Sequence, residues 1–454
     1  MTAREIGSKT FHLVSLGCAK NTVDSESIAQ LLLSSDYQPV EDPSRAQVLI
    51  VNTCGFIAPA KDESFQVLRD LAARKQDGQT LIAAGCLTQR YGAEVARQVP
   101  GVDGILGTRR WMDILDVLER LRNGGHPQPV YHLPEVDTVG RDEGQVIRAA
   151  VQGGSAYLKI ADGCRRPCAF CAIPLIKGTA VSRPMDTIIE EATILQDHGI
   201  RELILIAQDT TDYGHDLGIR DGLAELLEKL TAAVPGIDWI RVMYAYPGYV
   251  TDRLIEVMGA SQQILPYLDI PLQHAHPSAL RRMRRPANID WMFRTIEKMR
   301  SRIPDLALRT TFIVGYPGET EEEFHSLLEF VEEMRFDRLG AFKFSFEPGT
   351  SSEPLGDPVP MQVKEERFER LMQLQQPISL AKNQALVGSR LDVLVEGYGD
   401  GISLGRSYRD APEIDGMVII DGKLPAGDIV PVRINGAMVY DLSGIPDSEI
   451  INPV

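Results

Sequence analysis

Short apolar runs of strand length alternate with helix-like stretches along most of this chain, and that alternation restricts the fold to the α/β class. A first series occupies about residues 9–125, where each strand-like run is followed by a stretch with the apolar period of a helix. The expected strands are 11–16, 46–51, 80–84 and 102–106, and the expected helices are 22–35, 59–75, 88–98 and 109–122. This order predicts an open parallel α/β sheet domain.

A second, longer series fills about residues 150–376 with six strand–helix units. The expected strands are 156–161, 202–207, 239–245, 267–272, 307–315 and 341–346, and the expected helices are 186–198, 220–233, 250–259, 289–301, 320–334 and 362–375. Six such units fit a partial (β/α)6 barrel better than one doubly wound sheet, although periodicity alone does not decide between them. The Pro- and Gly-bearing stretch 123–140 is typical of a linker or surface excursion, and we assign 126–149 to the linker.

The last segment, 378–454, changes character. Its apolar runs are short, β-branched and separated by Gly, Asp and Pro, as in VGSRLDVLVEG, GMVIID, DIVPVRING and AMVYDLSG. That pattern predicts a small antiparallel β barrel. The segment carries six Lys and Arg residues against eleven Asp and Glu residues, so its formal net charge is −5.

The length and charge of the whole chain limit its partners and its location. A chain of 454 residues predicts about three domains. Its 47 Lys and Arg residues against 63 Asp and Glu residues give a net charge of −16. That balance counts against tight, purely electrostatic RNA binding and suits a basic partner, although a merely solvated acidic surface is commoner. No apolar stretch approaches the roughly 18 residues of a membrane helix, and the N-terminus lacks a signal-peptide core, so we expect a cytoplasmic protein without membrane contact.

Three of the six cysteines stand together in GCRRPCAFCAIP (163–174), at Cys164, Cys168 and Cys171. The C-x3-C-x2-C spacing puts three thiolates on one loop after the first strand of the second series, at the edge where barrel enzymes keep their active sites. Structural zinc normally takes four ligands in pairs, but no second pair is near, and His198 and His274 lack ligand-pair spacing. A 4Fe-4S cluster held by three thiolates leaves one iron open, and we favour it over zinc.

The other three cysteines follow one another at strand ends in the first series. Cys18, Cys54 and Cys86 have the similar contexts SLGC, VNTC and AAGC. Because the carboxyl ends of parallel strands share one edge of a sheet, three successive units bring these thiols to one place. Each could instead be a small buried hydrophobe, as most free cysteines are. Three such positions, with no other cysteine in the segment, favour a joint cluster site.

The central motif resembles that of the radical S-adenosylmethionine superfamily, with the aromatic Phe170 just before the last cysteine. The resemblance implies a (β/α)6 barrel in which the open iron binds the amino and carboxylate groups of S-adenosylmethionine. One electron, from a low-potential donor such as flavodoxin or ferredoxin, then cleaves the sulfonium. The resulting 5′-deoxyadenosyl radical abstracts hydrogen from an unactivated carbon.

Over about residues 11–445, the chain resembles the methylthiotransferases of that superfamily. The matching motifs are SLGCAKNTVDSE, VNTCGFI, GCRRPCAFCAIPLIKG, SRP (182–184), PLQHA, MRRP and IVGYPGETEEEF. The last segment is similar to the family's TRAM domain, an OB-like barrel. By this resemblance, Cys18, Cys54 and Cys86 hold an auxiliary 4Fe-4S cluster that delivers sulfur as a methylated sulfide or polysulfide. One molecule of S-adenosylmethionine supplies the methyl group, and another supplies the radical.

Two strand ends of the second series offer further candidate contacts to the cofactor. Gln208, Asp209 and Thr210 end the second strand, and we expect them to line the cofactor pocket, although Asp and Thr also cap turns. Gln273 and His274 end the fourth strand on the same side. We count Gln273 among the cofactor contacts and give His274 no role, because a lone His is more often structural.

The region at and after the fifth strand is similar to the family's cofactor-contacting region. Its candidate residues are Arg309, Gly315, Gly318 and Glu319. Glycine there would let the backbone approach a ligand closely, but glycine before a helix is also plain turn chemistry. The basic run RRMRR (281–285) is either a substrate-facing surface or a solvated helix face.

Two branches of the methylthiotransferases compete for this chain. One modifies an isopentenyl-adenosine in transfer RNA. The other methylthiolates the β-carbon of an aspartate in the basic small-subunit ribosomal protein S-twelve. The acidic last segment, the net charge of −16, and the stretches GRSYRDAPEIDG (405–416) and QDTTDYG (208–214) favour the second branch. We therefore expect S-twelve as the substrate of a monomer in which direct nucleic-acid binding does not dominate.

A hypothesis of another class is a non-catalytic module, stabilised by a cluster or by zinc, that binds ribosomes or RNA. It predicts that metal binding persists without any reductive cleavage of S-adenosylmethionine, whereas the enzyme produces 5′-deoxyadenosine once a reductant is added.

Overall fold

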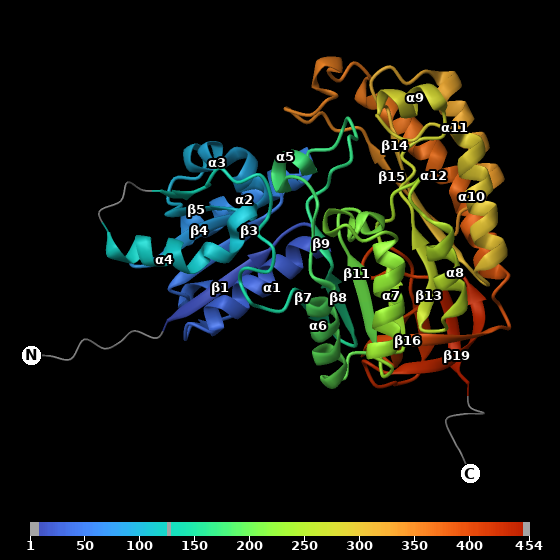
Figure 1. The fold of residues 1–454 in the computed structure, drawn as a ribbon, viewed down its shortest axis with the longest axis horizontal. Helices are drawn as coiled ribbons and strands as arrows, with labels where there is room; N and C mark the ends of the chain where they lie inside the picture. Colours follow the sequence, from blue (N-terminus) through green and yellow to red (C-terminus); the bar gives the residue numbers. More distant parts are fainter. Residues whose placement is uncertain (1–8, 125–128, 448–454) are drawn as a thin grey trace, which may run out of the picture.

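The computed structural model describes residues 9–124 and 129–447, which form three units in chain order (Figure 1). The first unit is a six-stranded parallel sheet in the order β2-β1-β3-β4-β5-β6. Its strands are β1 (Thr10–Ser15), β2 (Gln38–Pro39), β3 (Val48–Thr53), β4 (Thr80–Gly85), β5 (Gly104–Gly107) and β6 (Val130–His132). Its helices are α1 (Ala19–Leu33), α2 (Ala58–Arg74), α3 (Cys86–Gln98) and α4 (Ile114–Asn123).

Helices cover both faces of this first sheet, as its nearly continuous apolar strands require. Ile28 of α1 and Val117 of α4 pack on one face, and Phe65 of α2 and Val95 of α3 pack on the other. The predicted open parallel sheet is confirmed. The structure adds β6, which lies inside the stretch 123–140 that the sequence assigns to a linker and pairs with β5. Its three residues are too few to show a strand period.

The second unit is a seven-stranded open sheet in the order β15-β14-β13-β12-β11-β8-β7. Six strands run parallel, and β7 pairs antiparallel with β8 at one edge, which agrees with a partial (β/α)6 barrel. The strands are β7 (Ala149–Gln152), β8 (Ser155–Lys159), β11 (Glu202–Ile206), β12 (Trp239–Val242), β13 (Ile264–Asp269), β14 (Ala307–Val314) and β15 (Arg338–Lys343). A small antiparallel pair, β9 (Ala161–Asp162) and β10 (Val181–Ser182), follows β8.

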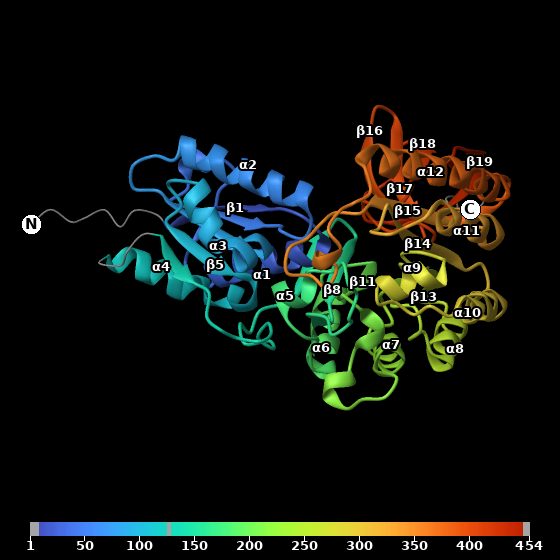
Figure 2. The same cartoon turned by 90° about the horizontal axis from the view of Figure 1, so that it is seen from above.

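Helices cover the outer face of the second sheet and form the largest apolar core of the molecule. They are α6 (Met185–Asp197), α7 (Gly222–Ala233), α8 (Asp252–Ala260), α9 (Pro277–Arg282), α10 (Ile289–Arg302), α11 (Glu321–Met334) and α12 (Met361–Gln384), and the short α5 (Ile173–Lys177) lies apart from them beside α3. The inner face, seen from above in Figure 2, is shared by the two other units. Ala19 and Val23 of α1 contact it from the first unit, and Leu394 and Ala411 contact it from the third.

The third unit is a closed five-stranded barrel in the order β16-β17-β18-β20-β19. Its strands are β16 (Arg390–Gly399), β17 (Ile402–Ser407), β18 (Val418–Asp421), β19 (Ile429–Ala437) and β20 (Leu442–Pro446). All neighbours pair antiparallel except β18 and β20, which are parallel. The predicted small β barrel is therefore confirmed. The sequence pattern did not mark β17, whose stretch ISLGRS is rich in Ser and Gly.

Buried ion pairs attach the barrel to the second unit. Arg406 of β17 reaches the fully buried carboxylate of Glu202 on β11 at 2.7 Å, and Arg241 of β12 contacts the same carboxylate at 2.7 Å. Arg409 lies 2.9 Å from Asp337, and Asp415 accepts a hydrogen bond of 2.7 Å from Tyr267. Because breaking one partner of a buried pair strands the other charge, these contacts fix the barrel in one position.

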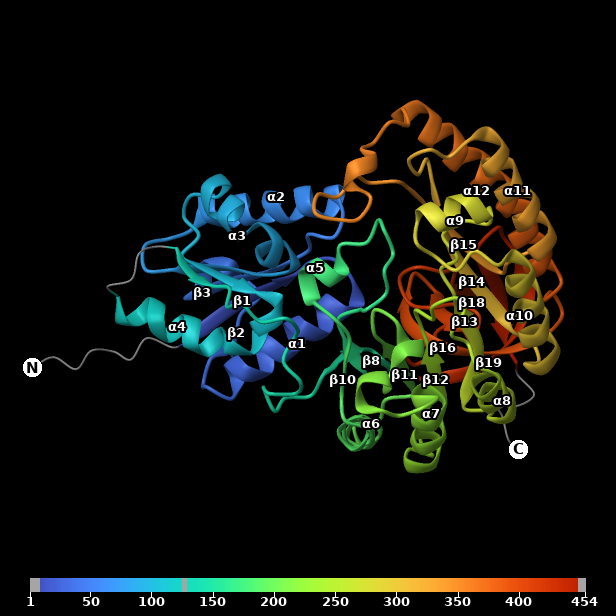
Figure 3. The same ribbon diagram turned by 45° about the horizontal axis from the view of Figure 1, so that its top comes forward.

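A second set of buried charges joins α1 of the first unit to the second unit, where the views in Figures 1 and 3 place α1 beside the edge of the central sheet. Asp24 of α1 and Asp162 of β9 share three cations, Arg148, Lys159 and Lys177. Lys177 lies 2.8 Å from Asp24 and 2.9 Å from Asp162.

Within residues 9–124 and 129–447, no helix has the length and apolarity needed to cross a membrane.

Candidate active site

The three N-terminal cysteines lie at one edge of the first sheet. Cys54 and Cys86 directly follow β3 and β4, and Cys18 comes three residues after β1, at the start of α1. A Cβ atom added to Gly17 would lie 3.0 Å from Sγ of Cys54, so the loop before Cys18 packs directly on Cys54. Gly17 has φ +99°, a conformation that glycine adopts readily. The topology thus places the three cysteines at the same edge of the sheet.

Two asparagines fix these strand ends against each other. The Asn21 amide donates to the carbonyls of Leu16 at 2.6 Å and Asn52 at 3.0 Å, and the Asn52 amide donates back to the Asn21 carbonyl at 3.0 Å. Both side chains are buried. The start of α1 is therefore held at the end of β3, and Cys18 and Cys54 are held with it.

The central cysteines lie on the loop between β9 and α5. The Cys164 amide donates to the Gly178 carbonyl at 3.0 Å, which closes the base of the loop. The amide of Ala169 donates to Met283 at 2.9 Å, and its carbonyl accepts a hydrogen bond of 2.6 Å from the hydroxyl of Ser352. Backbone bonds to distant segments therefore hold this loop in one conformation.

A cationic and aromatic cluster surrounds Cys168. Arg285 donates to the Cys168 sulfur at 3.4 Å, and the phenol of Tyr246 lies 3.7 Å from the same atom. Two guanidinium groups contact the Tyr246 ring, with Arg285 at 4.2 Å and Arg166 at 4.7 Å from its centre. The cluster thus places a guanidinium and a phenol beside the sulfur of Cys168. The sequence pattern did not single out Tyr246 or Arg166, and it left Arg285 inside an undecided basic run.

The two cysteine triads are neighbours across the boundary between the first two units. Cys86 packs against Ala172, which directly follows Cys171, and against Ile176 of α5. Burial, helped by the other thiols of the same triad, raises the pKa of Cys86 and of Cys171 to about 12 each. Burial likewise raises the pKa of Cys164 to about 11 and that of Cys54 above its usual value. In each triad the thiols act electrostatically on one another.

The six free cysteines form two sets of three thiols, the donor type that iron–sulfur clusters take from proteins. In the described part of the chain, no three His, Cys, Asp or Glu side chains converge on one point as ligands of one ion must. A cluster instead takes its thiolates at different iron atoms, so more widely spaced thiols suit it. Near the central triad, buried polar atoms lack a hydrogen-bond partner, among them Oε1 of Gln208 and Nε of Arg285. Such unpartnered groups suit a site that takes a polar cofactor.

The residues after β11 connect the loop of the central cysteines to the carboxyl edge of the second unit's sheet. Arg166 pairs with Asp209, and Arg165 forms a bidentate pair with Asp212, with contacts of 2.6 to 3.0 Å. Burial raises the pKa of Asp209, against the opposing charge of Arg166. Thr210 is fully buried, and its hydroxyl donates a hydrogen bond of 2.8 Å to the Met243 carbonyl. The predicted cofactor contacts Asp209 and Thr210 thus have protein partners, whereas Oε1 of Gln208 has none among the residues that the structure describes.

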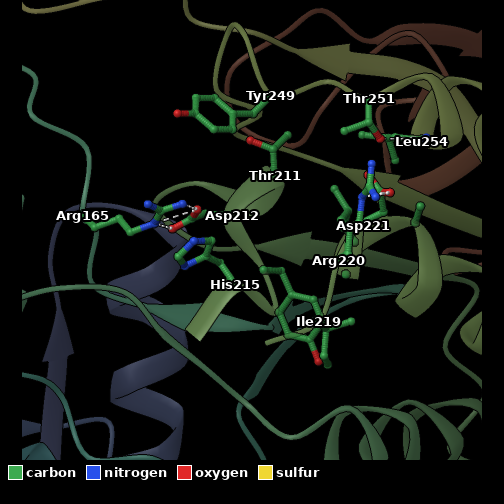
Figure 4. Close-up of a pocket in the computed structure, with 14 residues that line it drawn as sticks. Arg165, Thr211, Asp212, His215, Ile219, Arg220, Asp221, Tyr249, Thr251 and Leu254 are labelled. Atoms are coloured by element: carbon green, nitrogen blue, oxygen red, sulfur yellow. Dashed lines mark hydrogen bonds and ion pairs between the residues drawn. The ribbon is translucent and has the colours of Figure 1, made fainter. Parts of the chain in front are cut away.

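A pocket of about 210 Å3 opens beside this stretch (Figure 4). It lies between the loops after β11 and β12, and the Arg165–Asp212 pair stands at one side of it. Thr211 and Tyr249 also line it, but none of Gln208, Asp209 and Thr210 does. The cofactor contacts expected at the end of β11 are therefore outside the lining of this pocket.

The turn after β14 is held by Glu319. Its Oε2 accepts backbone hydrogen bonds from Gly315 and from Tyr316, the latter at 3.1 Å. His274 accepts a bond from the His276 amide at Nδ1, so its Nε2 carries the proton toward Glu319 at 3.4 Å. Both side chains are fully buried. Glu319 therefore stabilises the turn, and His274 contacts Glu319 from the strand end after β13.

Three more predicted cofactor contacts lie in this region, and close packing places two of them, Gly315 and Phe170. A Cβ atom on Gly315 would lie 2.4 Å from Cγ of Lys364, so this glycine allows α12 to pack against the turn. Phe170 packs with Met283 and Tyr316 in a small apolar cluster. Gln273 has φ +75° and pairs through its backbone with β14, its amide donating 2.8 Å to Thr311. All three lie around the carboxyl ends of the parallel strands of the second unit.

Arg309 points to the inner face of the central sheet. It lies 3.0 Å from Asp269 of β13 and 3.3 Å from Asp415, which belongs to the loop between β17 and β18. Burial raises the pKa of Asp269, against the charge of Arg309, and Oδ2 of Asp269 has no hydrogen-bond partner among the described residues. Arg309 is therefore engaged with the barrel loop in this structure.

One cation near the N-terminal triad was missed by sequence reasoning. Lys20 lies two residues after Cys18, and its Nζ lies 3.1 Å from the centre of the Tyr244 ring on the inner face. Burial lowers the pKa of Lys20, and the charges of Cys18 and Asp269 oppose this. Tyr244 has φ +63°, a left-handed backbone that costs a bulky residue about 1–3 kcal/mol. No periodic signal could have found this contact, because the two residues are far apart in sequence.

Three family models match successive parts of the chain. The Radical SAM superfamily model matches residues 158–331, and the TRAM domain model matches residues 387–446. Residues 10–107 match a model described as an uncharacterized protein family, UPF0004. These matches correspond to the three structural units.

Curated relatives match nearly the whole length of the chain. The ribosomal protein uS12 methylthiotransferase RimO of Chloroflexus aurantiacus is 49% identical over 450 residues, covering 96% of this chain and 99% of the relative. The protein of the same name from Roseiflexus sp. is 47% identical and covers 96% of each chain. Among solved structures, the radical S-adenosylmethionine methyltransferase TsrM of Kitasatospora setae has a TM-score of 0.58 at 13% identity, covering 87% of this chain and 77% of that one. This last similarity concerns the fold alone.

Proposed function

Because the chain belongs to the RimO family of ribosomal protein uS12 methylthiotransferases, we propose that it transfers a methylthio group to the β-carbon of an aspartate in uS12, the ribosomal protein S-twelve. The observation that carries the proposal is the contact between Cys86 and the residues that follow Cys171. This contact supports two neighbouring three-thiol sites. A reaction that needs both a radical and a sulfur donor needs two such sites close together.

Cys164, Cys168 and Cys171 would hold the 4Fe-4S cluster that binds S-adenosylmethionine, and Cys18, Cys54 and Cys86 would hold the auxiliary 4Fe-4S cluster with its sulfide or polysulfide. When bound, these groups supply the radical, the methyl group and the sulfur. The chain's own part is electrostatic and positional. Arg285 and Tyr246 would stabilise the Cys168 thiolate, and the buried Lys177 would offset the negative charge beside Cys86.

The remaining predicted cofactor contacts stay proposals. Gln208, with its unpartnered buried oxygen, is the best supported of them. We propose that Phe170, Gln273, Gly315 and Glu319 shape the cofactor site by holding the strand ends, and that Asp209 and Thr210 hold the loop after β11. Arg309 would act from the inner face, where the substrate rather than the cofactor would lie.

The acidic barrel supports a basic protein substrate. Asp392, Asp400, Asp421 and Asp428 are exposed on it. Acidic surfaces raise the rate of encounter with basic proteins, whereas an RNA-gripping barrel gains from basic groups. We further propose that the enzyme acts as a monomer in the cytoplasm, with a low-potential donor such as flavodoxin or ferredoxin.

Mass analysis of a strain that lacks this chain tests the proposal. We expect uS12 to lose a methylthio group while transfer-RNA nucleosides keep theirs. Loss from isopentenyl-adenosine instead would assign the chain to the RNA-modifying branch. Reconstituted protein should release 5′-deoxyadenosine from S-adenosylmethionine when reductant is added, and metal binding without this release would support the non-catalytic module.

A further inference from the structure

Lys20 has no direct hydrogen-bond or ion-pair partner among the described residues, although the carboxylate of Asp269 acts on its charge from a longer distance. Its ammonium lies over the Tyr244 ring at 3.1 Å, yet it makes no hydrogen bond or ion pair with any residue that the structure describes. The side chain is half-buried, and the neighbouring Cys18 is exposed, so solvent reaches this point. A ring face attracts a cation but does not saturate its three N–H donors.

The other cations of the inner face are all paired. Arg309 contacts Asp269 and Asp415, and Arg241 contacts Glu202. Arg338 contacts Asp410, and Lys159 contacts Asp24 and Asp162. Among the described residues of this face, Lys20 is thus the cation with a vacant place for an anion.

The position of Lys20 is built by the fold. Tyr244 takes its left-handed backbone because Thr210, which is fully buried, donates to the Met243 carbonyl at 2.8 Å, while the Thr210 amide donates to the Tyr244 carbonyl at 3.1 Å. On the other side, Asn21 fixes the first turn of α1 to the end of β3. Both partners of the Lys20–Tyr244 contact are therefore anchored by buried hydrogen bonds.

We propose that Lys20 is the substrate-binding residue that holds the side-chain carboxylate of the target aspartate. This inference rests on the proposed function. The β-carbon of an aspartate is one bond from its carboxylate carbon, so anchoring the carboxylate fixes the carbon that receives the methylthio group. Lys20 is two residues from Cys18, which places that carbon beside the N-terminal triad. The Lys20 ammonium is neither acid nor base in the reaction.

Binding measured without reductant tests this proposal separately from turnover. The probes are purified uS12 and uS12 with the target aspartate changed to asparagine, and the protein is the cluster-loaded full chain. We expect the unmodified chain to bind the aspartate form at least about tenfold more tightly, as a charge-assisted hydrogen bond allows. Lys20→Met should bind both forms equally, and Lys20→Arg should keep the preference.

Lys9→Met is the matched control. Lys9 also lies over a tyrosine ring, that of Tyr37 at 5.4 Å, and donates to the Ser35 carbonyl far from both triads. This variant should keep the full preference for aspartate. The iron absorbance of Lys20→Met and of the unmodified chain should be equal, because Lys20 is not a ligand.

Different results would contradict the role of Lys20 and the methylthiolation of uS12. If Lys20→Met keeps the full preference for the aspartate form, or if the unmodified chain has none, the role of Lys20 is wrong even when uS12 is methylthiolated normally. If the unmodified chain never methylthiolates uS12, the proposed function itself is wrong. Should Lys20→Met lose its clusters, Lys20→Arg and Tyr244→Leu carry the test, since arginine must keep the preference and loss of the ring must weaken it.

Discussion

The ammonium of Lys177 lies 2.8 Å from the carboxylate of Asp24, 153 residues earlier in the chain. Asp24 lies on the helix that begins after Cys18, and Lys177 ends the short helix that follows Cys171. The pair therefore ties together the two segments that carry the cysteine triads. Burial would lower the pKa of Lys177, but Asp162 and Asp24 outweigh it and raise that pKa, so the lysine stays charged.

Removing the negative charge of Asp24 should separate the first two units. Asp24→Asn leaves Lys159, Lys177 and Arg148 with one carboxylate among them, and we expect a loss of about 3–5 kcal/mol in the free energy of unfolding. Urea denaturation followed by circular dichroism measures it. Lys229→Met is the control, because its pair with Glu225 is exposed and should contribute less than about 1 kcal/mol. Equal midpoints for the two variants would refute the buried network.

The two triads should be separable by mutation. Cys54→Ala removes one N-terminal thiol without touching the central loop, so 5′-deoxyadenosine should still form while methylthiolated uS12 falls below detection. Cys164→Ala should abolish both products. Chromatography of the nucleoside and mass analysis of uS12 from the same reaction measure the two. Methylthiolation that survives in Cys54→Ala would show that the N-terminal triad does not supply the sulfur.

Acid should loosen the barrel through Glu202. Burial alone would raise the pKa of this carboxyl, but Arg406 and Arg241 outweigh it and lower the pKa to about 2, from a usual value of 4.5. A lowered pKa contributes stability above the unfolded value, and this contribution disappears as the pH falls from about 4.5 toward 2. The stability difference between the unmodified chain and Glu202→Gln should shrink over that window. A difference that does not change with pH would contradict the assignment.

Binding of uS12 should weaken as salt is added. Exposed carboxylates on the barrel attract a basic partner over a Debye length, which is about 10 Å at 0.1 M salt. Replacing Asp392, Asp400 and Asp428 by Asn should slow association several-fold at low salt and flatten its salt dependence. Stopped-flow association measures the rate. The same number of changes at the exposed Asp77, Asp116 and Glu119 of the first unit should leave it nearly unchanged, and an equal effect there would point to net charge alone.

Local patterns predicted the longer strands and helices of this fold and placed three cysteines at strand ends, because strand period, turn residues and strand-end position are set within a few residues. They did not predict the contacts that give the site its charge. Arg285 meets Cys168 across 117 residues, and Arg406 meets Glu202 across 204. A basic residue in a helix gives no local sign of which loop it will face. Glu319 shows the converse, since a motif similar to a cofactor contact is here held by backbone amides.

The salt bridges between β17 and the central sheet also bear on how such proteins could be recombined. A chain ended after α12 would leave the guanidinium of Arg338 without Asp410, and Glu202 with one of its two arginines gone. The β barrel therefore cannot be exchanged freely between related enzymes. A chimeric enzyme would have to take Glu202 and Asp337 from the same protein as the barrel. The barrel and the central sheet would then be exchanged together.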